Sequence, residues 1–331
     1  MIEYLLGLFS HDVAIDLGTA NTLVWVKRTG IGGGNAKGIV IRQPSVVARH
    51  KKTKRILAIG SEAKKMIGKT PENVEAIRPL RDGVIADFDA AAGMLSYYIK
   101  KVHYRPNAFI QPIPRPRVIV GIPSGVTEVE RRAVWEATLE AGAREAYLIE
   151  EPMATAIGAG LPIEESHGSM VVDIGGGTSE IAVISLGGIV VNRSVRIAGD
   201  EMDEAIINFV RLKHALLIGQ LTAEEVKLTV GSVFPGVPEE DQKTVIRGRS
   251  LEDGLPKSIR VSTSEIREAL IPVVQQIISH IQEIIEETPP ELVGDIMENG
   301  IVLAGGGSRI AGIEKLVARE VKMPVWVAED P

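Results

Sequence analysis

The fold of this 331-residue chain is constrained most strongly by a glycine-rich turn that lies between two apolar runs and has a counterpart earlier in the chain. This turn lies within residues 170–184, which read MVVDIGGGTSEIAVI. Its apolar ends are rich in β-branched residues, so the segment predicts a β-hairpin. Three consecutive glycines expose backbone N–H groups at the bend, which can therefore bind an anion such as phosphate. Asp173 would repel phosphate unless a cation lay between them, which indicates Mg²⁺ with a nucleotide.

The same pattern occurs earlier, in residues 13–26, which read VAIDLGTANTLVWV. Superimposing the two segments, 157 residues apart, pairs Asp16 with Asp173, Gly18 with Gly175 and Asn21 with Thr178. An ordinary glycine-rich hairpin does not need an aspartate at the same place twice. The repeat therefore predicts two similar subdomains that face one ligand.

A third glycine loop lies near the end of the chain. Residues 301–320 read as a strand, then Gly305-Gly306-Gly307-Ser308, then a helix from about residue 310. The Gly-Lys-Ser/Thr of a Walker A motif is missing, which excludes a P-loop. Three glycines at a helix N-terminus still allow a flat or anionic ligand to approach closely. We expect the three glycine loops to meet in one cleft.

Glu151 is the candidate for chemistry. Hydrolysis of a γ-phosphate needs an in-line water held by an acceptor, with a metal neutralising the phosphate charge. Glu151 ends a predicted strand and precedes Pro152, which is suited to open a helix over residues 153–159. Thr178 could hold the same water. The alternative is that Glu151 only stabilises the helix N-terminus through the helix macrodipole.

Composition limits the class of protein. The chain is long enough for about two domains, and 45% hydrophobic with 24% charged residues is a globular composition. A net charge of −6 gives no sign of a nucleic-acid-binding surface. The absence of cysteine excludes a disulfide scaffold and a zinc–thiolate site. No membrane-spanning run or secretory signal is evident, so we expect a cytoplasmic protein.

Two apolar segments leave alternatives open. The first places Ile2, Leu5, Leu6 and Phe9 on one helical stripe; it is either packed on the body or frayed, or it is an in-plane membrane anchor. The second, Phe109-Ile110, lies in a proline-rich loop flanked by arginines. It is either buried or inserted into a lipid surface.

Several helices can be predicted from capping and periodicity. Thr127 and Glu130 form a capping box before a helix that ends near residue 141. Further helices are expected over residues 86–102, 204–217, 223–230 (capped by Thr222) and 264–287.

Six motifs carry a family resemblance: DLGTANT at 16–22, IEEP at 149–152, DIGGGTSE at 173–180, AGDEMD at 198–203, TPPEL at 288–292 and LAGGGSR at 303–309. Together they resemble the actin/Hsp70/sugar-kinase ATPases, and within that group the MreB family of bacterial actins. The likeness runs from about residue 11 to the last residue and includes RPLRDGVIADF at 78–88.

The resemblance implies an α/β, actin-like ATPase fold. Each of two lobes would contain an RNase H-like five-stranded mixed sheet flanked by helices, plus a small subdomain. The implied divisions are 1–47 with 81–165 (IA), 48–80 (IB), 166–201 with 265–331 (IIA) and 202–264 (IIB). In this family a final helix of the first lobe follows the position of Pro331.

The resemblance also implies ATP or ADP with Mg²⁺ between the lobes, and it assigns roles by motif. Asp16 and Asp173 would lie near the metal, mainly through water, and Glu151 matches the hydrolytic glutamate, with Glu150 as its neighbour. One side of the phosphates would be held by Gly18, Thr19, Ala20 and Asn21, and the other by Gly175, Gly176, Gly177 and Thr178. Adenosine would be contacted by Glu224 and Lys227, and the base and sugar side by Gly305, Gly306, Gly307 and Ser308.

For partners, the resemblance implies antiparallel double filaments of the chain itself on the inner membrane face, with membrane proteins of the cell-elongation machinery. Val129 matches the contact between protofilaments. Ile2, Leu5, Leu6, Phe9, Phe109 and Ile110 match the membrane-binding places. The chain departs from the pattern in longer segments at 30–37 and 104–116 and in an N-terminal stripe without basic residues, which weakens attraction to anionic lipid.

Two other functions share such a nucleotide cleft. A small-molecule kinase of the sugar or acetate type would need a substrate pocket with its own base, for which the sequence offers no further candidate. An Hsp70-type chaperone would need a peptide-binding domain after the ATPase, for which 331 residues leave no room. We therefore expect a filament-forming ATPase.

Overall fold

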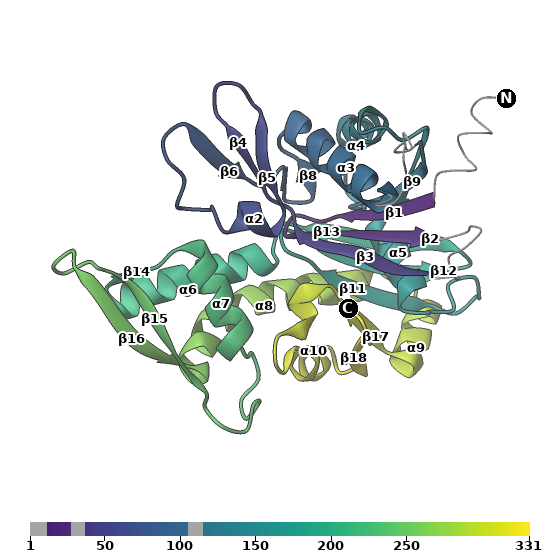
Figure 1. Ribbon diagram of the computed structural model, residues 1–331. Coiled ribbons are helices and arrows are strands. Elements are labelled where there is room, and N and C mark those ends of the chain that lie inside the picture. Colours follow the sequence, from purple (N-terminus) through teal and green to yellow (C-terminus); the bar gives the residue numbers. More distant parts are fainter. Residues whose placement is uncertain (1–11, 28–36, 105–114) are drawn as a thin grey trace. The chain divides into compact units, whose positions relative to one another are not determined.

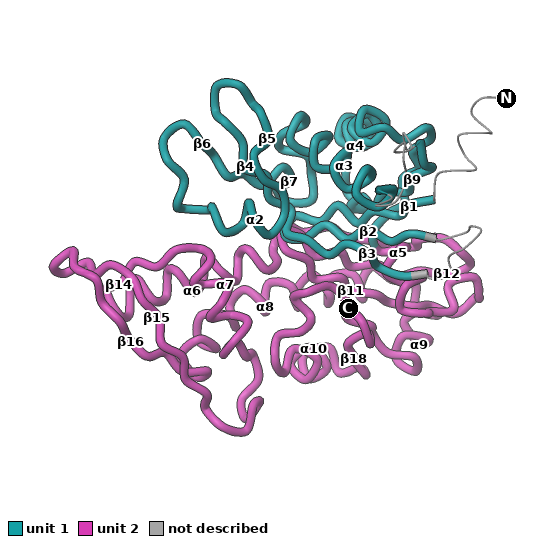
Figure 2. The backbone as a smooth tube through the Cα atoms, in the orientation of Figure 1, with its two compact units in different colours: residues 1–151 teal, residues 152–331 magenta. Residues whose placement is uncertain are grey.

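The computed structural model describes residues 12–27, 37–104 and 115–331. The chain divides into two compact units, residues 1–151 and residues 152–331 (Figure 2). Each unit has its own sheets and its own hydrophobic core.

The described part of the first unit contains a five-stranded mixed sheet (Figure 1). In spatial order its strands are β10 (Glu145–Glu150), β9 (Arg117–Ile122), β1 (Asp12–Leu17), β2 (Asn21–Lys27) and β3 (Lys37–Pro44). The strands β1, β9 and β10 run parallel, whereas β1, β2 and β3 pair antiparallel. Along β1, Val13, Ile15 and Leu17 are buried and Asp16 is exposed, as expected where one face of a strand meets the core.

Two helices, α3 (Phe88–His103) and α4 (Glu128–Glu140), pack their apolar faces on this sheet and complete the core of the first unit (Figure 1). The predicted capping box of α4 is confirmed. The Thr127 backbone N–H donates to Glu130 at 2.7 Å, and the Glu130 N–H donates to the Thr127 hydroxyl.

The smaller part of the first unit is a three-stranded sheet of β5 (Ile56–Ile59), β4 (Val47–His50) and β6 (Val74–Ile77), with α2 (Ser61–Lys64) and the hairpin β7 (Leu80–Arg81) and β8 (Val84–Ile85). Arg49 in β4 is 7% exposed and donates to Asp87 at 2.6 and 2.9 Å and to Glu75 at 2.7 Å. These bonds hold the pKa of both carboxyl groups below their usual range. Asp87 also caps α3 through the Ala90 N–H, so Arg49 ties the small sheet to that helix.

We expect Arg49→Met to lower the free energy of unfolding by about 3 kcal/mol at pH 7, because Asp87 loses its arginine partner and Glu75 keeps only the more exposed Lys54, at 3.3 Å. The stabilisation is complete above the unfolded-state carboxyl pKa values, near 4, and is lost as the pH falls through the lower folded-state values. Urea unfolding of both proteins at pH 7 and pH 3 measures the effect. The control is Arg55→Met, at an exposed position, which should change the free energy of unfolding by less than about 0.5 kcal/mol. An equal Arg49→Met deficit at both pH values would contradict this account.

The described part of the second unit repeats the pattern of strand directions in a five-stranded sheet of β18 (Val325–Val327), β17 (Ile301–Ala304), β11 (Ser169–Ile174), β12 (Ser179–Ser185) and β13 (Gly188–Val195). Its first hairpin has the same register as β1 and β2. Leu17 pairs with Thr22, and Ile174 pairs with Ser179, each 157 residues later. The predicted duplication of the hairpin is confirmed at the level of single residues.

Both faces of this second sheet are covered. On one face Ala156 of α5 (Glu151–Gly158) packs against Val171, Ala182 and Ile184. The other face meets a larger core that includes α8 (Thr263–Glu287). Burial on both sides accounts for the continuous apolar runs of β11 and β12. The remaining elements of this unit are α6 (Gly199–His214), α7 (Gln220–Val230), α9 (Pro290–Asn299), the 3₁₀ turn η1 (Gly306–Arg309), α10 (Ile313–Val321) and a three-stranded sheet of β14 (Leu216–Leu217), β15 (Lys243–Ser250) and β16 (Pro256–Ser262).

Four predicted helix starts were wrong. The helix α5 begins at Glu151 itself rather than after Pro152, and α6 begins at Gly199 rather than at residue 204. Thr222 does not cap α7, which begins at Gln220 after Gly219. The third glycine loop does not open an α-helix: it forms η1, and α10 begins only after Gly312, whose φ is +80°. The four-subdomain boundaries stay a prediction.

Candidate functional site

The two glycine turns share a close backbone approach. A Cβ on Gly18 would lie 2.8 Å from the Asn21 carbonyl oxygen, and one on Gly175 would lie 3.0 Å from that of Thr178. Both distances are at or below the limit for a real Cβ contact, so each position favours glycine. The alignment made from sequence, Gly18 with Gly175 and Asn21 with Thr178, is thus matched by equivalent geometry. Each turn presents backbone groups with little side chain around them.

The first turn, Gly18 to Asn21, is held by two neighbouring segments of its own unit. The Ser45 hydroxyl donates to the Gly18 carbonyl at 2.6 Å, and the Gly83 N–H donates to the Thr19 hydroxyl at 3.1 Å. Thr19 is buried, so its side chain braces the loop. Gly83 and Asp82 both have positive φ in the turn between β7 and β8, as a tight hairpin requires. Sequence reasoning missed Ser45, which lies between β3 and β4, and Gly83, which lies between β7 and β8.

The second turn, Gly175 to Thr178, is held by the N-terminus of α6. The Gly199 N–H donates to the Gly175 carbonyl at 3.2 Å, and the Asp200 N–H donates to the Gly176 carbonyl at 2.7 Å. The start of α6 thus fixes two successive carbonyls of the turn. These bonds hold the backbone of the turn in place. The Gly175 N–H itself donates to the Thr178 carbonyl at 2.9 Å, so the candidates for contact with a ligand are the N–H groups that follow it in the turn.

The structure brings the third glycine loop against the second. Because β17 lies parallel to β11, a Cβ on Gly305 would lie 2.3 Å from Asp173 Oδ1, and one on Gly307 would lie 2.4 Å from Ile174 Cγ2. Ser308 is 1% exposed and its hydroxyl donates to the Gly305 carbonyl at 2.7 Å. Its side chain therefore shapes the loop, and any ligand contact here would come from the glycine backbone.

The two predicted metal-site aspartates have different surroundings. Asp16 is exposed at the end of β1. Asp173 accepts a 2.6 Å hydrogen bond from the Thr155 hydroxyl, and its other oxygen lies against Gly305. Burial raises the pKa of the Asp173 carboxyl, and the Thr155 bond opposes this.

No group of three or more metal-ligating side chains occurs among the described residues. Single carboxylates suit an ion such as Mg²⁺, which keeps several waters and is bound mainly through substrate phosphates. The two aspartates are compatible with a metal held through water, and the metal site stays a prediction.

The adjacent glutamates Glu150 and Glu151 differ in their neighbours. Glu150 lies 3.7 Å from the Arg131 guanidinium of α4. Glu151 is the first residue of α5 and lies beside Gly121, where a Cβ would be 3.5 Å from Glu151 Cγ. Its place at a strand-to-helix junction fixes its backbone, as orientation of a water requires. Thr178, the second candidate for holding that water, is 8% exposed.

The predicted adenosine residues Glu224 and Lys227 both lie on α7. Lys227 points into the protein: its Nζ lies 2.8 Å from Asp203 Oδ1 and donates to the Gly199 carbonyl at 2.6 Å. Burial raises the pKa of the Asp203 carboxyl to about 6, although the Lys227 ammonium lowers it. Sequence reasoning did not single out Asp203 or Gly199, although both lie in the AGDEMD motif.

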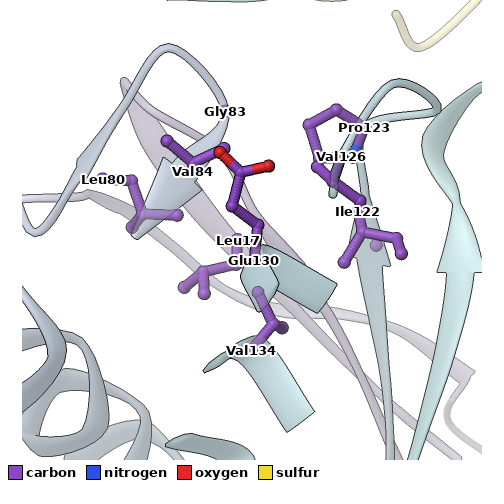
Figure 3. Close-up of a pocket in the computed structure, with 10 residues that line it drawn as sticks. Leu17, Leu80, Gly83, Val84, Ile122, Pro123, Val126, Glu130 and Val134 are labelled. Atoms are coloured by element: carbon purple, nitrogen blue, oxygen red, sulfur yellow. The ribbon is translucent and has the colours of Figure 1, made fainter. Parts of the chain in front are cut away.

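A narrow hollow of the first unit lies under the N-terminal turn of α4 (Figure 3). Figure 3 shows the Glu130 side chain reaching from α4 toward Val84. The rest of the lining of this hollow is mostly apolar and consists of Leu17, Leu80, Gly83, Gly121, Ile122, Pro123, Val126 and Val134. A hollow of this chemistry offers few donors to phosphate, so we do not assign it to the nucleotide.

Comparison with known proteins identifies the family. The profile of the family described as MreB/Mbl protein matches residues 10–331. The chain belongs to the MreB/Mbl family. It is 50% identical to the cell shape-determining protein MreB of Escherichia coli (strain K12), covering 100% of this chain and 92% of that protein. It is 45% identical to the cell shape-determining protein Mbl of Bacillus subtilis (strain 168), covering 98% and 93%.

Solved structures give the same answer for the fold of this MreB/Mbl family member. The crystal structure of MreB5 of Spiroplasma citri bound to ADP has a TM-score of 0.88 at 38% identity, covering 98% of this chain and 93% of that one. The MamK double helical filament has a TM-score of 0.78 at 25% identity, covering 97% and 95%. The predicted actin-like fold is therefore confirmed, with a mixed five-stranded sheet in each unit.

The predicted surface residues fall in two groups. Val129 lies in the first turn of α4 and is 78% exposed. Ile2, Leu5, Leu6, Phe9, Phe109 and Ile110 lie outside the described residues. Within the described ranges we find no helix long and apolar enough to cross a bilayer.

Proposed function

We propose that this MreB/Mbl family member binds ATP and hydrolyses it during assembly into filaments that organise cell-wall synthesis and rod shape. The observation that carries the proposal is the duplicated turn, with the same register and the same glycine constraint in both units. Two MreB5 structures of Spiroplasma citri, bound to ADP and to AMPPNP, support a nucleotide as the ligand.

Each turn would supply part of the phosphate contacts: Gly18, Thr19, Ala20 and Asn21 in the first unit, and Gly175, Gly176, Gly177 and Thr178 in the second. Glu224 and the glycines at 305–307 would lie toward the adenosine. Asp16 and Asp173 would hold Mg²⁺ through water, and the ion would neutralise phosphate charge.

Glu151 would accept a hydrogen bond from the attacking water and orient it, with Thr178 as a second contact. The junction of β10 and α5 supports this role because it fixes the Glu151 backbone. Glu150, which faces Arg131, is assigned no part in the reaction.

Assembly into double antiparallel filaments is the second element of the proposal. The fold similarity to the MamK double helical filament supports polymerisation, and the exposure of Val129 supports α4 as a contact between protofilaments.

The filaments would lie on the inner face of the cell membrane, with membrane proteins of the cell-elongation machinery as partners. The apolar residues near positions 2–9 and at 109–110 motivate this part. Co-sedimentation of the chain with anionic vesicles tests it. A Phe109→Ser/Ile110→Ser variant that still co-sediments as wild type would remove that loop from the membrane contact.

The kinase alternative is not favoured by the comparisons, and an activity assay separates the two. A filament ATPase should release phosphate without any acceptor, at a rate per chain that rises steeply once the protein concentration permits assembly. A kinase would transfer phosphate to a small acceptor and show little release alone. Acceptor-dependent turnover by a chain that stays monomeric would overturn the proposal.

A further inference from the structure

Lys227 holds its charge inside the second unit, at the contact of α6 and α7. Its side chain is 12% exposed and Asp203 is 2% exposed, and their charged atoms are 2.8 Å apart. The ammonium also donates to the Gly199 carbonyl at 2.6 Å. The buried ammonium is therefore already bound by two protein groups, which indicates a structural role beyond contact with a ligand.

Gly199 is the link from Lys227 to the second turn. Its N–H donates to the Gly175 carbonyl, while its own carbonyl accepts from Lys227. A Cβ on Gly199 would lie 3.2 Å from the Gly175 oxygen and 3.3 Å from Lys227 Nζ, so the three groups are packed with little space to spare. The next N–H, of Asp200, holds the Gly176 carbonyl at 2.7 Å. A displacement of Lys227 would therefore release the start of α6 and, with it, the turn.

We propose that Lys227 is a positioning residue for the second glycine turn: it clamps α6 through Gly199 and Asp203 so that the backbone of Gly176 and Gly177 stays in place to bind the β- and γ-phosphates. This rests on the proposed nucleotide-binding function and changes the role expected for Lys227, from an adenosine contact to a support of the phosphate contacts.

The two roles predict different patterns of ligand affinity. AMP, ADP and ATP share adenosine, so loss of an adenosine contact weakens all three by the same factor. The N–H groups of the turn bind phosphates that AMP lacks. Loss of a support for that turn should leave the affinity for AMP within about twofold of wild type and lower the affinity for ADP more. It should lower the affinity for ATP by about tenfold, the size expected for one charge-assisted hydrogen bond.

Titration calorimetry with AMP, ADP and ATP, each with Mg²⁺, should be done on wild type and on Lys227→Met and Asp203→Asn. Asp203 is buried and cannot reach a ligand, yet D203N should reproduce the graded loss. A purely electrostatic effect of Lys227 on phosphate predicts the opposite for D203N, because removing a negative charge would tighten ATP binding. The control is Lys257→Met, which removes an exposed lysine with its own carboxylate partner, Glu252, at 3.4 Å; it should bind as wild type.

The outcomes separate the inference from the function on which it rests. Equal loss for all three nucleotides in K227M, or ATP binding unchanged or tighter in D203N, would overturn the positioning role while the nucleotide site stands. Failure of the wild-type chain to bind ATP would instead overturn the proposed function. If K227M unfolds, D203N and Lys227→Gln, which keeps a donor, give the same comparison.

Discussion

Replacing Glu151 by alanine should slow phosphate release by about 100-fold or more while ATP still binds, since a residue that orients a reacting water typically contributes a factor of this size. Glu151 stands at the fixed junction of β10 and α5, beside Gly121, and the substitution removes only atoms beyond Cβ. Filaments of the variant should form with ATP and persist, because the nucleotide in them is not hydrolysed. Single-turnover phosphate release and pelleting over time measure both effects.

The neighbouring glutamate gives a matched control. Glu150→Ala removes the same atoms one residue earlier, where the carboxylate faces Arg131 at 3.7 Å. It should release phosphate within about threefold of wild type, because an ion pair between half-exposed groups contributes little. Wild-type phosphate release by the Glu151 variant would remove that residue from the mechanism. An equal loss in both variants would point to damage at the junction rather than to chemistry.

Gly305→Ala should lower the free energy of unfolding by about 3 kcal/mol or more and weaken ATP binding at least tenfold. The backbone at Gly305 has φ +77° and ψ 161°, a region that other residues rarely adopt. The new Cβ would lie 2.3 Å from Asp173 Oδ1 and 2.4 Å from the Ile174 carbonyl. Relief of these contacts would have to displace the end of β11, where the second turn begins.

The adjacent Gly306→Ala provides the comparison, because no heavy atom lies within 4 Å of its Cβ position. Gly306→Ala should fold, and its free energy of unfolding should differ from that of wild type by less than about 1 kcal/mol. Urea unfolding and ATP titration of both variants decide the matter. Equal behaviour of the two alanines would mean that the packing of Gly305 on β11 has no energetic importance.

The parts of the fold that could be predicted from sequence are those that local pattern specifies. The two hairpins combine apolar β-branched runs with a glycine turn, and both occur, with equivalent pairs 157 residues apart. The Thr127–Glu130 capping box also depends on residues three positions apart. The start of α6 has a weaker local signal, because the Ala198 N–H donates to Glu201 at 2.7 Å but Ala198 has no capping side chain, and the start of α10 has no side-chain cap. Gly199 opens α6 because it packs on Gly175, and Gly305 turns away from a helix because it packs on Asp173, both contacts between distant segments.

The candidate site divides in the same way. The glycine turns and the aspartates beside them could be found by repetition within the chain, and the remaining roles came from resemblance. What sequence could not supply is the set of side chains behind the turns. Ser45 donates a hydrogen bond to Gly18, and Thr155 donates one to Asp173. Asp203 forms an ion pair with Lys227. The spacing of these residues along the chain does not predict the pairs.

The measurement that tests the central claim most directly is sedimentation of the purified chain with Mg²⁺ and ATP, ADP or no nucleotide, followed by electron microscopy of the pellet. We expect polymer to form with ATP above a threshold protein concentration, to be reduced or absent without nucleotide, and to appear as paired filaments. A chain that binds no ATP, or that sediments equally in all three conditions, would contradict a nucleotide-dependent filament.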